Sequence, residues 1–258
     1  MISGKSFADT CNWVFDPRYP EKPVFDYRFA KHGDWVFVNG DYWNQLVSRI
    51  IPYTSFGSQK KFMFVVHNSD LPFGTQQFRL LSPHAIHIYA INTTISHPMI
   101  TTIPLGFVDR QLPLLPGFKG GSSERPIEAY MNFLDQTNAP KRRECREALA
   151  NDPRITRASG LSVPEYLIDL GRSRFVICPE GTGMDTHRVY ESLFCGATPV
   201  VLHSPLDPLY QRLPVCIVNK WTDPFYVPPQ RENVWECPFF LTRIPNEIHP
   251  SIPSTVTP

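Results

Sequence analysis

Residues 175–202, FVICPEGTGMDTHRVYESLFCGATPVVL, constrain the fold more than any other part of the chain. They begin with a short apolar run that ends at a proline, the pattern of a strand buried on both faces in a parallel sheet. Gly181 and Gly183 then allow a tight loop whose backbone can approach a ligand. A helix over 187–194 and an apolar strand over 198–202 follow. The stretch therefore predicts one βαβ unit whose ligand-binding end is marked by the glycines.

The start of that helix carries the side chains that an anionic ligand needs. Asp185 or Thr186 can cap the helix. Thr186, His187 and Arg188 lie in its first turn, where they can join the helix dipole around a pyrophosphate. Glu191 lies one turn after His187 and can accept the two hydroxyls of a ribose. The alternative is that Arg188 and Glu191 form an ordinary surface ion pair and the glycines serve only the turn.

This stretch resembles the C-terminal half of exostosin-like glycosyltransferases. The similarity covers about 166–221 and includes RSR at 172–174 and LPV at 213–215. A weaker similarity, at 90–92 and 103–106, matches the strand and loop that close their N-terminal domain. The resemblance implies an α/β chain of the GT-B fold, in which two Rossmann-like domains with parallel sheets face each other across a cleft. This chain would be a compact, virus- or protist-type member.

The order of apolar runs also favours two α/β units. The runs and helical patterns alternate, which is typical of a doubly wound parallel sheet, and the predicted strands of the first unit lie near 35–38, 61–66, 86–90 and 101–104, with a helix over 42–51. In the second unit we expect a strand over 129–133 and helices over 141–150 and 163–171, the latter capped by Ser162. Residues 111–125, rich in Pro, Gly and Ser, are the predicted linker.

We therefore divide the chain into three parts. Residues 1–115 would form a Rossmann-like acceptor domain, and residues 116–235 the domain that binds the nucleotide-sugar donor. Residues 236–258 would form an irregular tail, because prolines are frequent near the C-terminus.

The sequence His67-Asn68-Ser69-Asp70 follows a predicted strand directly. It should lie at the carboxyl end of that strand, where open α/β sheets bind ligands. An inverting transfer needs a general base near the attacking hydroxyl, and a carboxylate or an imidazole can serve. We expect Asp70 to be this base, ahead of His67. The alternative is that Asp70 only caps the following turn, with Asn68 and Ser69 as turn formers.

Three more residues belong to the predicted donor site. Glu180 either contacts donor hydroxyls or restrains the glycine loop by accepting backbone hydrogen bonds. Arg157 and Ser159 lie where the resemblance implies an approach to the donor. No DxD pair is present to hold a metal ion, so the helix dipole with His187 and Arg188 would stabilise the leaving diphosphate.

Composition excludes several classes of function. The net charge is +1 and no Lys/Arg block is longer than 141–143, which argues against a nucleic-acid binder. The apolar runs are too short to span a bilayer, so we expect a soluble, cytoplasmic chain, with room for a removed membrane anchor. The six cysteines are singly spaced, which predicts reduced thiols and no zinc site.

These features predict a glycosyltransferase that moves a sugar from a nucleotide diphosphate sugar to a hydroxyl of a glycan or glycoprotein. The donor would be a UDP-sugar such as UDP-xylose, UDP-glucuronate or UDP-galactose, and the transfer would be inverting and metal-independent. The nucleotide sugar is a co-substrate, and no cofactor is expected. The alternatives are a glycan-binding module with a degenerate donor site and another enzyme that uses nucleotide sugars. A Rossmann dehydrogenase would need a GxGxxG loop that the sequence lacks.

Overall fold

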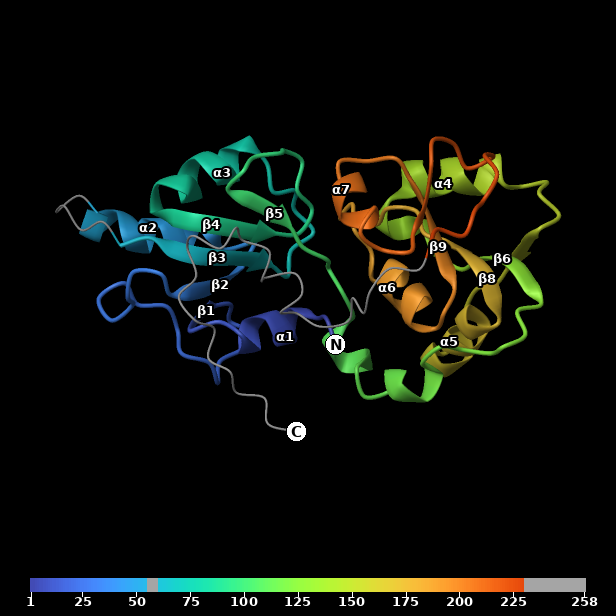
Figure 1. Cartoon of the computed structure of the whole chain (residues 1–258), viewed down its shortest axis with the longest axis horizontal. Coiled ribbons are helices and arrows are strands. Elements are labelled where there is room, and N and C mark those ends of the chain that lie inside the picture. The colour runs from blue at the N-terminus through green and yellow to red at the C-terminus, as the bar shows by residue number, and fades with distance from the viewer. Residues whose placement is uncertain (55–59, 230–258) are drawn as a thin grey trace.

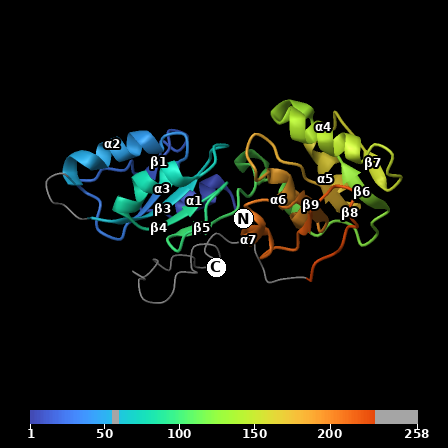
Figure 2. The ribbon, with the colours of Figure 1, turned by 90° about the horizontal axis from the view of Figure 1, so that it is seen from above.

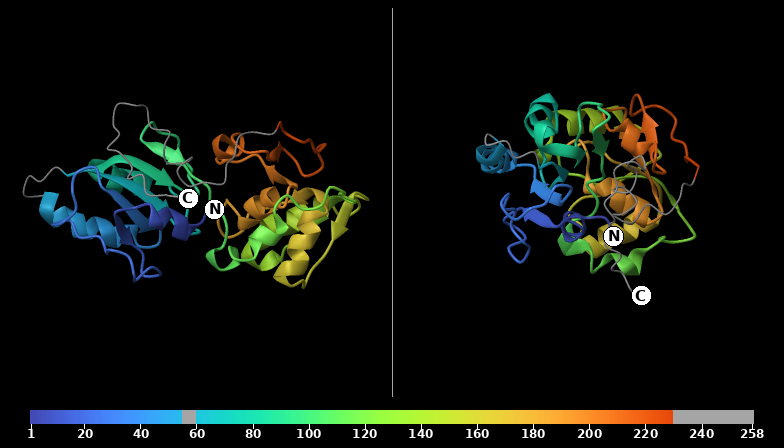
Figure 3. Two further views of the ribbon diagram at one scale, coloured as in Figure 1. Left: turned by 60° about the horizontal axis from the view of Figure 1, so that its bottom comes forward. Right: turned by 60° about the vertical axis from the view of Figure 1, so that its left-hand side comes forward.

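The chain folds into two α/β units, each built on a five-stranded sheet (Figure 1). The computed structural model describes residues 1–54 and 60–229, so the predicted tail over 236–258 lies outside the described residues. All strand pairs in both sheets are parallel, as predicted. Figure 2 and the left view of Figure 3 show the same arrangement of two neighbouring units from other directions.

The N-terminal sheet has the strand order β1-β2-β3-β4-β5, which follows the chain. Its strands are β1 (Trp13–Phe15), β2 (Trp35–Asn39), β3 (Phe62–His67), β4 (Ala85–Ala90) and β5 (Ile100–Thr102). Every crossover runs in one direction, so the sheet has no point where the order reverses. The expectation of a doubly wound sheet is therefore wrong for this unit.

Alternate residues of these strands face two different cores. Phe64 and Val66 pack in one core with α2 (Trp43–Thr54) and α3 (Thr75–Leu81), whereas Met63 and Val65 pack in another with Phe7 of the N-terminal helix. This helix, α1 (Gly4–Asp9), covers the opposite face of the sheet. The strands are buried on both faces, which explains their nearly continuous apolar runs.

The C-terminal sheet has the order β10-β9-β8-β6-β7, which reverses direction after β7. Its strands are β6 (Ile127–Met131), β7 (Ile155–Arg157), β8 (Ser173–Ile177), β9 (Thr198–Leu202) and β10 (Cys216–Val218). One face packs against α4 (Ala139–Ala148), and the other against α5 (Val163–Gly171), α6 (His187–Phe194) and α7 (Asp207–Tyr210). The reversal creates a topological switch point between β6 and β8, where doubly wound sheets bind their ligands.

The predicted elements of the C-terminal unit agree closely with those observed. Helices α5 and α6 and strand β9 have the predicted bounds. Ser162 caps α5, and its backbone N–H donates to Glu165 over 2.8 Å, one half of a capping box. The short elements α1, β1, α3 and β7 were not predicted, because three to seven residues carry too little periodicity.

An apolar core continues from one unit into the other. The rings of Phe107 and Phe194 meet edge to face with centroids 5.6 Å apart. The predicted linker falls between β5 and β6 and contains a 3₁₀ turn, Leu115–Phe118. The start of the chain pairs with this connection, since the Phe107 N–H donates to the Ile2 carbonyl over 2.8 Å. Among the helices of the described residues, none has the length and apolar character needed to cross a bilayer.

Candidate functional site

The loop over 179–186, called the glycine loop below, is held by residues of the N-terminal unit. The backbone N–H of Asp185 donates to Asn92 Oδ1 over 2.8 Å. The Leu105 N–H donates to Asp185 Oδ2 over 2.9 Å, and His187 Nδ1 donates to the Gly106 carbonyl over 2.7 Å. The loop that follows the central strand of the second sheet is therefore docked on the first unit.

Asp185 is the centre of this junction. Only 3% of its surface is exposed, and its carboxylate accepts hydrogen bonds from the N–H groups of Leu105 and Thr186 and from the hydroxyls of Tyr190 and Tyr210. Burial raises the pKa of this carboxyl, and the hydrogen bonds partly offset the increase. Thr186 is the residue at the N-cap position, as predicted, but it is the Asp185 side chain that accepts its backbone N–H.

The expected diphosphate contact of His187 is corrected by this geometry, whereas that of Thr186 stays a prediction. The His187 imidazole is bonded to the Gly106 carbonyl in the connection between the units. The Thr186 hydroxyl is enclosed and has no hydrogen-bond partner among the described residues. The His187 side chain thus belongs to the junction, because it is bonded to the connection between the units.

Two guanidinium groups, those of Arg142 and Arg188, lie close together at the switch point. Arg142 of α4 and Arg188 of α6 lie 5.6 Å and 5.8 Å from the centroid of the Phe133 ring, which follows β6. Arg142 is 7% exposed; its Nε donates to the Glu180 carbonyl over 3.0 Å and its Nη1 to the Leu134 carbonyl over 2.6 Å. The carboxyl ends of β6 and β8 are therefore lined by positive charge.

These two cations repel each other. Burial lowers the pKa of Arg142, and the charge of Arg188 lowers it further. Burial also lowers the pKa of Arg188. The neighbouring Tyr166, Cys178 and Glu191 raise it by more, so the pKa of Arg188 is raised overall. Neither guanidinium forms an ion pair with a carboxylate of the described residues, and the Arg188 Nε is enclosed without an acceptor there. Such an arrangement favours binding of an anion.

Glu191 lies beside this pair but not on the surface. It is 5% exposed, and Tyr166 donates a hydrogen bond of 2.8 Å to its Oε2. Burial, and then the charge of Glu191, raise the pKa of Tyr166, so the hydroxyl stays a donor. The alternative of a surface ion pair between Arg188 and Glu191 is wrong, because Glu191 is buried and bonded to Tyr166.

Of the other predicted donor residues, one lies near the two arginines and two lie away from them. Glu180 lies in the glycine loop and forms an ion pair with Lys141. Arg157 instead donates to the carbonyls of Leu149 and Ala150 at the end of α4. Its strand is the edge strand β7, on the far side of β6 from β8, so the expected donor contact of Arg157 is corrected. Ser159 follows it on an exposed loop.

Gly183 brings the N-terminal unit close to the glycine loop. A Cβ atom at this position would lie 2.9 Å from Asn92 Nδ2 and 3.4 Å from Asp70 Oδ1. Asp70 is exposed and has no hydrogen bond or ion pair among the described residues. The following turn is capped by Ser69, whose Oγ accepts the Leu71 N–H over 3.0 Å. The alternative in which Asp70 caps the turn is therefore wrong.

His67 is enclosed within the protein. It is 1% exposed, and its ring nitrogens lie 2.9 Å from Asn68 Oδ1 and 3.2 Å from the Pro104 carbonyl oxygen. Burial lowers its pKa to about 4, although these two contacts oppose the shift. The prediction of His67 as a catalytic residue is corrected, because an enclosed imidazole cannot touch an acceptor.

Sequence reasoning missed two residues that define the site, Asn92 and Arg142. Asn92 has a φ of +52° and is buried between the two units, where its amide also donates to the Ser69 carbonyl over 3.3 Å. Arg142 was only one residue of a basic helix. A signal for Arg142 existed, because that helix follows the predicted strand over 129–133, and the loop and helix after a parallel strand border its carboxyl end.

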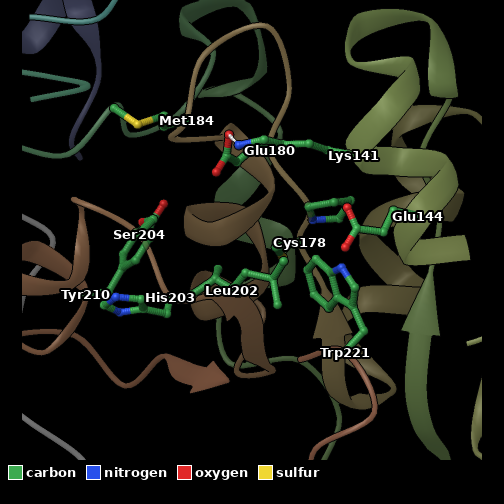
Figure 4. Close-up of a pocket in the computed structure, with 12 residues that line it drawn as sticks. Lys141, Glu144, Cys178, Glu180, Met184, Leu202, His203, Ser204, Tyr210 and Trp221 are labelled. Atoms are coloured by element: carbon green, nitrogen blue, oxygen red, sulfur yellow. Dashed lines mark hydrogen bonds and ion pairs between the residues drawn. The ribbon is translucent and has the colours of Figure 1, made fainter. Parts of the chain in front are cut away.

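A pocket of about 120 Å³ adjoins the glycine loop on the α4 side of the sheet (Figure 4). It lies at the carboxyl ends of β8 and β9 and is closed by α4, α7 and Trp221. Within the described part of the chain, no three His, Cys, Asp or Glu side chains form a group that could hold a metal ion. Cys145, Cys178, Cys195 and Cys216 are buried and form no disulfide among the described residues, and Cys237 lies outside the described residues.

No family model matches the chain, and no curated protein matches it significantly.

Proposed function

We propose that the chain is a GT-B glycosyltransferase that binds a nucleotide diphosphate sugar in its C-terminal unit. Its N-terminal unit would present a glycan or glycoprotein hydroxyl to that donor. The observation that carries the proposal is the pair of guanidinium groups, Arg142 and Arg188, at the switch point, beside a glycine loop whose Gly183 lies close to the exposed Asp70. A diphosphate supplies the negative charge that this pair lacks.

The two arginines would act on the leaving group. As the bond from the sugar to the diphosphate breaks, its electron pair moves to a phosphate oxygen. Arg142 and Arg188 are already fixed by their packing on Phe133, so they can stabilise the new charge without reorganisation. Glu191, oriented by Tyr166, would accept the ribose hydroxyls.

Asp70 would be the general base. The acceptor oxygen attacks the anomeric carbon while Asp70 takes its proton, and one displacement of this kind inverts the configuration. The Asp70 carboxylate is available for this role because no partner among the described residues occupies it. Gly183 supports the proposal, since a larger residue there would meet Asp70 and Asn92.

Nucleotide affinity tests the donor site. Titration calorimetry with UDP should show binding that Arg188→Gln weakens by about 1–3 kcal/mol, the cost of a lost charge-assisted hydrogen bond. The matched control is Arg143→Gln on the exposed side of α4, which removes the same charge and should leave the affinity unchanged. Equal losses of UDP affinity in both variants would mean that UDP responds only to the overall charge of the protein. If UDP and other nucleotide diphosphates do not bind, the alternative of a glycan-binding module with a degenerate donor site replaces the proposal.

A further inference from the structure

The pocket beside the glycine loop is not used by the proposed diphosphate site. Its volume of about 120 Å³ is below the roughly 300–1,000 Å³ of sites that enclose a whole drug-sized ligand, so it suits one ring of a larger molecule. Figure 4 shows its wall of Leu202, Cys178 and Trp221, with polar groups of Glu144, Lys141 and Glu180 at one side.

The position of the pocket relates it to both halves of the proposed reaction. Glu180 lines it, and the carbonyl of the same residue accepts a hydrogen bond from Arg142. Met184 lines it as well and follows Gly183, which faces Asp70. A ring bound here lies along the glycine loop, between Glu180, whose carbonyl contacts Arg142, and Met184, which follows Gly183. In a nucleotide sugar, the transferred sugar lies between the diphosphate and the acceptor, so it is the part of the donor that suits this place.

The charges of the pocket select among sugars. Glu180 and Lys141 form an ion pair, and His203 is paired with Asp207 outside the pocket. Glu144, an exposed residue of α4, has no ion pair with any described residue. A second carboxylate brought by the ligand would therefore meet a like charge, and Lys141, which also lines the pocket, is already paired with Glu180.

The remaining polar atoms favour hydroxyl groups. Trp221 is 4% exposed, and its Nε1–H has no acceptor among the described residues. Figure 4 shows the nitrogen side of the indole turned toward Glu144. A sugar hydroxyl can donate to a carboxylate and also accept from an N–H group, whereas a carboxylate can only accept. A neutral sugar thus matches both Glu144 and Trp221.

We propose that this pocket binds the transferred sugar and that this sugar is uncharged, a neutral hexose or pentose rather than a uronic acid. The inference rests on the proposed nucleotide-sugar function and narrows its donor. Of the expected donors, it retains UDP-xylose and UDP-galactose and excludes UDP-glucuronate.

The first experiment compares UDP-glucose with UDP-glucuronate, which differ only at C6, by titration calorimetry on the whole chain. We expect UDP-glucose to bind at least about tenfold more tightly, because the carboxylate faces Glu144. Glu144→Gln should reduce this ratio to below about threefold by improving UDP-glucuronate binding. The control Glu147→Gln, an equal charge change on the same helix outside the pocket, should leave the ratio unchanged. Equal affinities, or a preference for UDP-glucuronate, would overturn the inference.

The second experiment fills the pocket with Leu202→Phe and measures UDP and UDP-glucose separately. If the pocket holds the sugar, UDP-glucose affinity falls to that of UDP, and UDP affinity stays the same. A loss of UDP affinity would assign the pocket to the nucleoside, and unchanged affinities would leave it without a ligand; both outcomes overturn the inference. Absence of UDP binding to the unaltered chain is a different result, because it rejects the proposed function itself. The Glu144→Gln measurement decides the case if Leu202→Phe does not fold.

Discussion

The loop after β3 and the glycine loop after β8 follow the central strands of their sheets, yet their chemistry differs. The first ends in a single exposed carboxylate, Asp70, whereas the second lies among cations from two helices. The cause is topological. The order of the first sheet never reverses, so no crevice opens beside β3, but the second reverses between β6 and β8. Under the proposed function, the second unit would recognise charge and the first would supply a single reactive group.

The largest effect should come from Asp70→Asn, which keeps the shape of the side chain and removes its basicity. We expect the transfer rate to fall by about 10²–10⁴-fold, while nucleotide affinity, which depends on the other unit, stays unchanged. Single-turnover transfer and calorimetry measure the two quantities. Asp26→Asn, the same substitution at a carboxylate that is paired with Arg28 outside the site, is the control. A variant that transfers sugar at the normal rate would assign the base to another residue.

The loop after β3 should also make the free energy of unfolding fall at acidic pH, which the glycine loop should not do. The pKa of His67 is lowered by burial to about 4, so the unfolded chain, with a pKa near 6.5, binds more protons between these values. His67 therefore contributes stability above pH 6.5 and loses it as the pH falls toward 4, by up to about 3 kcal/mol.

Denaturant unfolding at a series of pH values measures this effect. In His67→Gln, the free energy of unfolding should change less with pH between 6.5 and 4. Asp185 acts in the opposite direction. Its pKa is raised, so its contribution is largest at low pH and is lost as the pH rises through the folded-state pKa. An unchanged slope in His67→Gln would show that the imidazole is solvated.

A smaller effect is expected from Gly183→Ala at the contact of the two loops. The new Cβ would lie 2.9 Å from Asn92 Nδ2, so the loops must move apart, at a cost of about 1–3 kcal/mol in the free energy of unfolding. Gly117→Ala is the matched control, because a Cβ there meets no atom within 4 Å and should change stability by less than about 0.5 kcal/mol. Equal stabilities of the two variants would contradict close docking of the glycine loop.

The smallest effect should follow removal of metal ions. If the two arginines replace a cation under the leaving diphosphate, transfer should continue at the same rate in EDTA. A loss of activity that manganese or magnesium restores would show that Arg142 and Arg188 alone do not stabilise the leaving diphosphate.

The sequence by itself determined the local elements around the site. The apolar run, the glycines and the amphipathic helix predicted β8, the glycine loop, α6 and β9, because these patterns depend on neighbours within one or two turns. It also predicted that Asp70 follows a sheet strand. Strand β7 and helix α3 were missed, since such short segments owe their conformation to the sheet on which they pack.

Only the tertiary structure decided which side chains meet. Arg157 and Arg142 are both basic residues of the second unit, but strand order puts the first at the edge and the second at the switch point. Docking of the two units decided that His187 bonds to the connection between them and that Asp185 joins their backbones. Burial then enclosed the His67 side chain, which no local pattern had indicated. These contacts join residues far apart in the chain, so no local pattern can encode them.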